Sequence, residues 1–164
     1  MNIGITCQQS YGDVINSHWL EAQIRQELQR FEVTEAYSCL STAVDCLFAS
    51  IILKQKLPLV AIIPASDELP KVKSDYGRVD DLKEQAAQKI KLSQDQEDVQ
   101  TAMFEANELM VEKVDVLLAV WNSLPERGFG GTADIVAYAK TLHKTIIQIN
   151  PANRSIKVLK KWNA

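Results

Sequence analysis

The residues with the clearest chemical potential form a glycine-rich turn between an apolar segment and an amphipathic one. Gly128, Gly130 and Gly131 allow the backbone to approach a ligand closely and to adopt positive φ. Arg127 can donate a forked pair of hydrogen bonds to a phosphate, and Thr132 adds a hydroxyl at the start of the next helix. Because the first N–H groups of a helix attract an anion, this turn predicts a phosphate-sized cradle.

A second group of small polar residues lies at the start of another predicted helix. Ser41 and Thr42 supply hydroxyl and amide donors, and Asp45 falls in the first turn of that helix. Asp134 occupies the same place in the helix after the glycine-rich turn. A carboxylate in a first turn is stabilised by the helix dipole, so capping and catalysis are both open for the two aspartates.

The residue types give little support to other catalytic or metal chemistry. His18 and His143 are predicted on helices away from the turns, so Ser41 and Cys7 lack a general base and a serine or cysteine hydrolase is not expected. The cysteines are three in number and contain no CxxC pair, which indicates neither a disulfide framework nor a structural zinc site. We expect no metal and no cofactor.

The elements that must position these residues follow an alternating pattern. Apolar segments of strand length alternate with segments of helical period, which is typical of an α/β protein. Strands are predicted at residues 3–6, 33–39, 59–63, 116–121 and 145–149, with a weak candidate at 89–92 and an edge strand at 156–159. Helices are predicted around residues 20–31, 43–54, 102–110 and 135–142, the last with Leu142 in the core. We therefore expect a single Rossmann-like domain over residues 1–164, with a mostly parallel central sheet flanked by helices.

The segment of residues 66–100 breaks this regularity, because it is rich in Asp, Glu, Lys and Gln. It is either a solvated surface segment or a mobile cover over the site. We favour the solvated alternative, since charged surface segments are commoner than lids.

Composition and charge restrict the partners and the location. A chain of 164 residues with 46% hydrophobic residues suits one compact core. The net charge of −3 offers no general attraction to nucleic acid or to an anionic membrane, although residues 157–161 are locally basic. No apolar run is long enough to span a membrane and no basic and apolar leader begins the chain, so we expect a cytoplasmic protein with no membrane partner.

In open α/β sheets, ligands bind beyond the carboxyl ends of the strands. Four turns are predicted at that edge, namely residues 6–13, 40–45, 64–67 and 121–134. The candidate site is therefore assembled from these turns.

Several stretches of the chain resemble the SLOG superfamily of Rossmann-like proteins. They are Ile-Gly-Ile-Thr at residues 3–6, residues 40–49, the strand ending at Pro64, and above all residues 115–122 followed by residues 128–134. The superfamily includes the lonely-guy phosphoribohydrolases, the core of DNA-processing protein A and ligand-sensing domains of bacterial conflict systems. The resemblance covers nearly the whole chain and implies a nucleotide or nucleotide-derived ligand held by the first turn and the late glycine-rich turn.

The resemblance leaves two functional classes open. The phosphoribohydrolases carry a catalytic glutamate three residues after the threonine of their glycine-rich motif, whereas this chain has Asp134 two residues after Thr132 and no PRxxG motif. We therefore favour binding of a nucleotide-type small molecule, as in a signal sensor. The alternative is an N-glycoside hydrolase or deoxyribosyltransferase that uses Asp134 or Asp45, since a carboxylate can stabilise or attack an oxocarbenium-like carbon.

The expected ligand-binding residues come from all four turns. They are Gly4, Thr6, Cys7, Gln8, Ser41, Thr42, Ala43, Asp45, Pro64, Trp121, Asn122, Arg127, Gly128, Gly130, Gly131 and Thr132. Nucleic-acid binding, as in the DNA-processing relative, is disfavoured by the acidic balance. The relatives of the superfamily commonly assemble, so the resemblance also implies a homo-oligomer.

Overall fold

The computed structural model describes residues 1–8, 16–65, 72, 74–92, 98–124 and 131–160. The strands of this part are β1 (Asn2–Cys7), β2 (Glu35–Ser38), β3 (Leu59–Ile63), β4 (Gln88–Lys91), β5 (Val116–Val120), β6 (Thr145–Asn150) and β7 (Ser155–Lys160). The helices are α1 (Ser17–Gln29), α2 (Ala43–Lys54), α3 (Val79–Gln85), α4 (Val99–Lys113) and α5 (Thr132–Thr141). The predicted α/β fold with a mostly parallel sheet is confirmed.

The strands form one seven-stranded sheet in the order β4-β3-β2-β1-β5-β6-β7. All neighbouring pairs from β4 to β6 are parallel, so these six strands have their carboxyl ends at one edge of the sheet. The chain builds outward from β1 to β4 and then returns to place β5 on the other side of β1. The direction of winding therefore reverses between β1 and β5, which is where ligands bind in this class of sheet.

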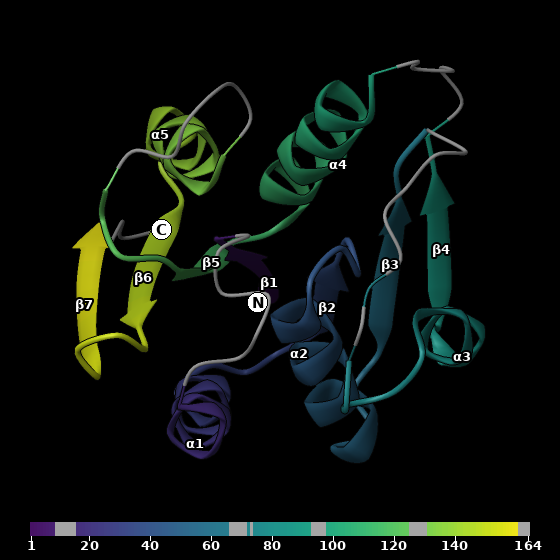
Figure 1. Cartoon of the computed structure of the whole chain (residues 1–164), viewed down its shortest axis with the longest axis horizontal. Coiled ribbons are helices and arrows are strands. Elements are labelled where there is room, and N and C mark those ends of the chain that lie inside the picture. The colour runs from purple at the N-terminus through teal and green to yellow at the C-terminus, as the bar shows by residue number, and fades with distance from the viewer. Residues whose placement is uncertain (9–15, 66–71, 73, 93–97, 125–130, 161–164) are drawn as a thin grey trace.

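Helices cover both faces of the sheet, as Figure 1 shows, with α1, α2 and α3 on one side and α4 and α5 on the other. Alternate residues of the strands face the two layers. In β1, Ile3 and Ile5 pack with α1 and α2, while Gly4 contacts Met110 and Val114 at the end of α4. The central strands read as continuous apolar runs because both of their faces are buried.

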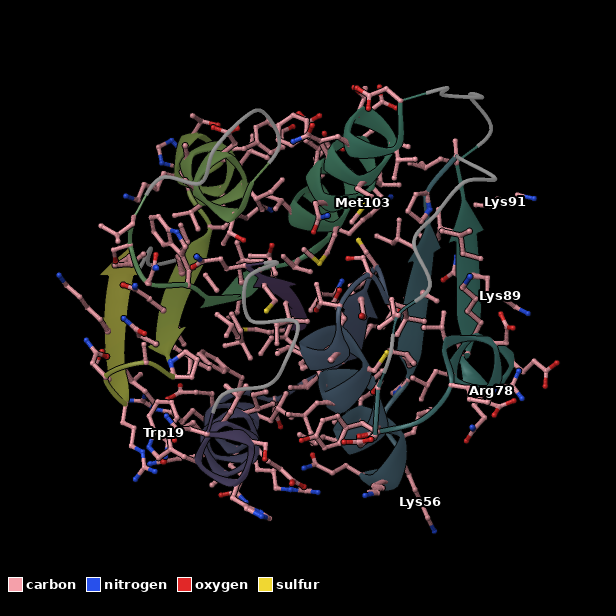
Figure 2. The ribbon with its side chains drawn as sticks, in the orientation of Figure 1. Trp19, Lys56, Arg78, Lys89, Lys91 and Met103 are labelled. Carbon is pink, nitrogen blue, oxygen red and sulfur yellow. The ribbon has the colours of Figure 1, made fainter. Side chains whose placement is uncertain are left out.

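The two outer strands of the sheet are different in character. Strand β4 is exposed at three of its four residues, and Lys89 and Lys91 project from it on the side opposite Ile90 (Figure 2). Strand β7 pairs antiparallel with β6 and leaves Val158 47% exposed. Charged side chains on an edge strand discourage pairing with another chain.

Most predicted elements are found within a few residues of their expected limits. The weak strand candidate at residues 89–92 corresponds to β4, which pairs with β3. The expected burial of Leu142 is wrong, because it follows the end of α5 as the C-cap residue and is 37% exposed. None of the helices among the described residues is long and apolar enough to cross a membrane.

Candidate functional site

The carboxyl ends of β1 and β5 meet at the reversal point and are tied together by one side chain. Gln8 follows β1, and its backbone N–H donates to the Val120 carbonyl at 3.0 Å. The Gln8 Oε1 accepts a hydrogen bond of 3.2 Å from the Asn122 backbone N–H. Cys7 lies inside β1, beside Val120 in the register, so it belongs to the strand instead of the turn. Thr6, Cys7 and Gln8 are all buried at this edge.

Trp121 closes the end of β5 by packing. Its side chain is 9% exposed and belongs to the apolar cluster beneath α4 and α5. The indole Nε1 donates to the Leu124 carbonyl at 2.9 Å, and Gln148 of β6 donates to the Trp121 carbonyl at 2.8 Å. These contacts hold the backbone of residues 121–124 against the sheet.

The start of α2 is closed by its own carboxylate. Asp45 Oδ2 accepts hydrogen bonds from the Ser41 N–H at 2.9 Å, the Ser41 hydroxyl at 2.9 Å and the Thr42 N–H at 3.1 Å. The Thr42 hydroxyl accepts in return from the Asp45 N–H at 3.1 Å, which completes a capping box. The donors that the sequence offered to a ligand at Ser41 and Thr42 are therefore used within the protein.

Asp45 itself lies deep in the molecule. Its side chain is 3% exposed, and its Oδ1 has no hydrogen-bond partner among the residues that the structure describes. Burial raises the pKa of the Asp45 carboxyl, although the hydrogen bonds from Ser41 and Thr42 act in the opposite direction. Burial, followed by the charge of Asp45, also raises the pKa of the Cys39 thiol well above its usual value and that of Cys46 to about 11. Both thiols are therefore held in the poorly nucleophilic neutral form.

The start of α5 also lies at this edge, and it is built differently from that of α2. Its N-cap residue is Gly131, which has no side chain to occupy the helix end, in extended conformation with φ −74° and ψ 177°. Thr132 is buried in the first turn, and Asp134 in the same turn is exposed. The predicted cradle residues Arg127, Gly128 and Gly130 lie outside the described residues.

The remaining predicted residues are spread along the same edge. Pro64 is buried directly after β3, and Ala43 is buried in the first turn of α2. Gly4 lies within β1, where an added Cβ would come within 3.0 Å of both Met110 Sδ and Val114 Cγ1. This packing accounts for a glycine at position 4 without a ligand.

A pocket of about 400 Å³ opens at the carboxyl ends of β2 and β3. Ser41 and Pro64 are the predicted site residues in its wall. Sequence reasoning missed the others, which include Cys39, Val72, Ser74, Arg78, Lys83 and Met103. Residues 72–83 follow β3 along the chain, and the sequence allowed this region to cover the site as one of two alternatives. No local sequence pattern identifies Met103 as a pocket residue.

Metal chemistry has no visible basis in the described residues, because no three His, Cys, Asp or Glu side chains there are grouped as metal ligands.

The fold and its ligand edge define a Rossmann-like α/β protein. The crystal structure of TM1055, a structural-genomics target, is similar over 88% of this chain and 71% of that one, with a TM-score of 0.56 and 14% identity. The Moco carrier protein from Chlamydomonas reinhardtii is similar over 90% of this chain and 74% of that one, with a TM-score of 0.50 and 14% identity. No protein-family model and no curated protein sequence matches the chain. At this identity, the likeness concerns the fold alone.

Proposed function

We propose that the protein binds a nucleotide or nucleotide-derived small molecule, with a phosphate at the N-terminus of α5. One contrast supports the proposal: among the described residues, Asp45 occupies the start of α2 and Asp98 caps α4, whereas the N-cap of α5 is a glycine. A phosphate at α2 would meet the buried Asp45, whereas at α5 it would meet a glycine N-cap and the first N–H groups of the helix, with the exposed Asp134 in the same turn. This contrast favours α5 over α2 and α4 as the position of the phosphate.

The wider resemblance is consistent with this function. The motif of residues 128–134 resembles that of the SLOG superfamily, and the similar solved structures have the same general fold. One of them is named as a carrier of Moco, so a related fold serves to hold a small molecule. We infer that this chain holds or senses a small molecule at the carboxyl edge of its sheet.

Replacement of Gly131 tests the phosphate position. Gly131→Asp should close the start of α5 as Asp98 closes that of α4, because its carboxylate would lie at the N-cap and repel an anion there. The backbone at Gly131 has negative φ, so a side chain introduces no strain. In calorimetric titrations with AMP, GMP, CMP and UMP, we expect Gly131→Asp to lower the affinity of every binding nucleotide by about tenfold or more, which corresponds to ~1.4 kcal/mol.

Gly131→Asn is the matched control, since asparagine caps a helix equally well without a charge. It should weaken binding less than Gly131→Asp, and both variants should unfold at or above the wild-type temperature. Equal affinity of wild type and Gly131→Asp for all four nucleotides would show that the phosphate lies elsewhere.

Of the two aspartates considered for the catalytic alternative, Asp134 is the better candidate. Asp45 is buried and already bonded through Oδ2, whereas Asp134 is exposed in the first turn of α5 beside the proposed phosphate. We therefore infer that any N-glycoside cleavage would depend on Asp134. Incubation with nucleoside monophosphates and deoxynucleosides should release no free base; release that Asp134→Asn abolishes would replace the binding role by an enzymatic one.

A further inference from the structure

The pocket at the ends of β2 and β3 has a mixed lining that suits a particular kind of ligand. Its volume of about 400 Å³ falls within the range of about 300–1,000 Å³ that is typical of small-molecule sites. Its walls come from the turn after β2, from the segment after β3, from α3 and from α4. Figure 2 labels two contributors that are distant in sequence, Arg78 at the start of α3 and Met103 on α4.

Apolar side chains form much of this lining. Leu40 and Pro64 are buried where β2 and β3 end, and Val72, Val79 and Met103 are half-buried around them. Such walls favour a flat or apolar group over a hydrated phosphate, because they offer contact area and few hydrogen-bond donors.

Two cations lie in the same lining. Arg78 is exposed and Lys83 is half-buried, and neither forms an ion pair within the part of the chain that the structure describes. Asp80 contributes one negative charge, so the charged lining is positive by one unit when Arg78, Lys83 and Asp80 are counted. A cation in a partly apolar pocket attracts an anion more strongly than one in open solvent.

The distance from this pocket to α5 is on the scale of an extended nucleotide. In the sheet, β2 and β3 are two and three strands away from β5, whose end leads to α5. Neighbouring strands are about 4.8 Å apart, so the two places are separated by roughly 10–15 Å along the edge.

We propose that this pocket receives the far end of the ligand whose phosphate lies at α5, and that this end combines a largely flat and apolar group with a second negative charge. The inference rests on the proposed function and specifies the class of ligand. Arg78 and Lys83 bind the second negative group, while Leu40, Pro64, Val79 and Met103 contact the ring. The ligand is then a nucleotide with anionic groups at two separate positions.

Two matched pairs of nucleotides test the second charge. Adenosine 2′,5′-bisphosphate differs from AMP by a phosphate on the ribose, and orotidine 5′-monophosphate differs from UMP by a carboxylate on the base. In calorimetric titrations of the full chain, we expect at least one doubly anionic member to bind about tenfold more tightly than its partner. The pair that shows the gain tells whether the second charge is on the sugar or on the ring.

A double variant locates the gain in affinity. The double variant that combines Arg78→Gln and Lys83→Gln should reduce this gain in affinity to less than threefold. Lys89→Gln with Lys91→Gln removes the same charge from the exposed strand β4, outside the pocket lining, and should preserve it. Circular dichroism and thermal unfolding of both double variants establish that they are folded.

The outcomes separate this inference from the proposed function. No gain for either doubly anionic nucleotide, or a gain that survives in the Arg78 and Lys83 variant, overturns the inference. Nucleotide binding that Gly131→Asp weakens would still support the proposed function. Absence of binding by all six nucleotides overturns both.

Discussion

At the scale of single residues, Asp45 shows how one carboxylate can decide the use of a helix end. Three donors from Ser41 and Thr42 converge on its Oδ2, while its Oδ1 is buried without a partner. A buried acceptor without a partner costs free energy, and burial raises the pKa of the carboxyl as a result. Asp45 thus closes α2 to anions at the expense of an unfavourable environment for its own charge.

Removal of the Asp45 side chain should destabilise the fold. Asp45→Ala leaves the donors of Ser41 and Thr42 unpaired and removes the cap, so we expect a loss of about 1–3 kcal/mol in the free energy of unfolding. Asp45→Asn retains an acceptor oxygen and should cost less. Urea denaturation at neutral pH measures both. Ser50→Ala, further along α2, is the control; an Asp45→Ala protein as stable as this control would contradict the capping role.

The pH dependence of the free energy of unfolding should reflect the raised pKa of Asp45. Since the folded state holds the Asp45 proton more tightly than the unfolded state, Asp45 contributes most to stability below its usual pKa of 3.8. This contribution is lost as the pH rises through the higher folded-state pKa. The stability of wild type relative to Asp45→Asn should therefore fall with increasing pH over that window and then become constant. A rise over the same window would show that the pKa is lowered instead.

At the scale of elements, the approach of α4 to β1 depends on a position without a side chain. Gly4 faces Met110 and Val114, and the contacts that a Cβ would make there are at 3.0 Å. Met110 is fully buried, and its side chain fills the space beside Gly4. The arrangement sets how closely α4 packs on the centre of the sheet, and so where β5 begins.

Gly4→Ala should destabilise the protein by about 1–3 kcal/mol through overpacking. Met110→Ala alone should cost about 2–5 kcal/mol because it leaves a cavity. In the double variant the added methyl group enters the vacated space, so the combined loss should be less than the sum of the single losses. A double-mutant cycle from denaturant unfolding measures this coupling.

The affinity for nucleotides gives an independent test of whether Gly4 serves packing or contacts the ligand. If Gly4 serves packing alone, the folded Gly4→Ala protein should bind the nucleotides of the Gly131 experiment as wild type does. Strictly additive losses of stability together with a loss of affinity would instead identify Gly4 as a ligand contact.

At the scale of the whole molecule, the sheet has a buried centre and exposed edges. Strands β1 and β5 are buried on both faces and paired with neighbours on both sides, while β4 is a short edge strand with mostly exposed residues. Local opening is easiest where few apolar contacts are lost. The carboxyl edge of the sheet, where the candidate site lies, therefore joins a buried half at β1 and β5 to a less buried half at β4 and α3.

Hydrogen exchange should reproduce this gradient. We expect the slowest amide exchange in β1 and β5, and the fastest exchange among the strands in β4, because opening β4 exposes little apolar surface. A nucleotide that occupies the pocket should slow exchange in α3 and β4 as well as at the start of α5. Protection of β4 equal to that of β1 without ligand would contradict the gradient.

The sequence was sufficient for the elements and for the edge that holds the site. Strands such as Leu59–Ile63 and helices such as Ala43–Lys54 have hydrophobic periods that depend only on neighbouring residues, and their predicted limits agree with the structure. In a parallel sheet, the turns that follow the strands must gather at one edge. The grouping of residues 6–8, 40–45 and 121–122 therefore follows from local patterns alone.

Only the tertiary structure decided how that edge is used. Local sequence showed that Asp45 and Asp134 share a place in the first turn of a helix, yet Asp45 is buried and Asp134 is exposed. The pocket that joins Met103 to Arg78 and Lys83 was equally out of reach, since its walls come from segments separated along the chain. The physical reason is that burial and long-range contact depend on which elements pack together. The hydrophobic period of one segment does not identify the element against which it packs.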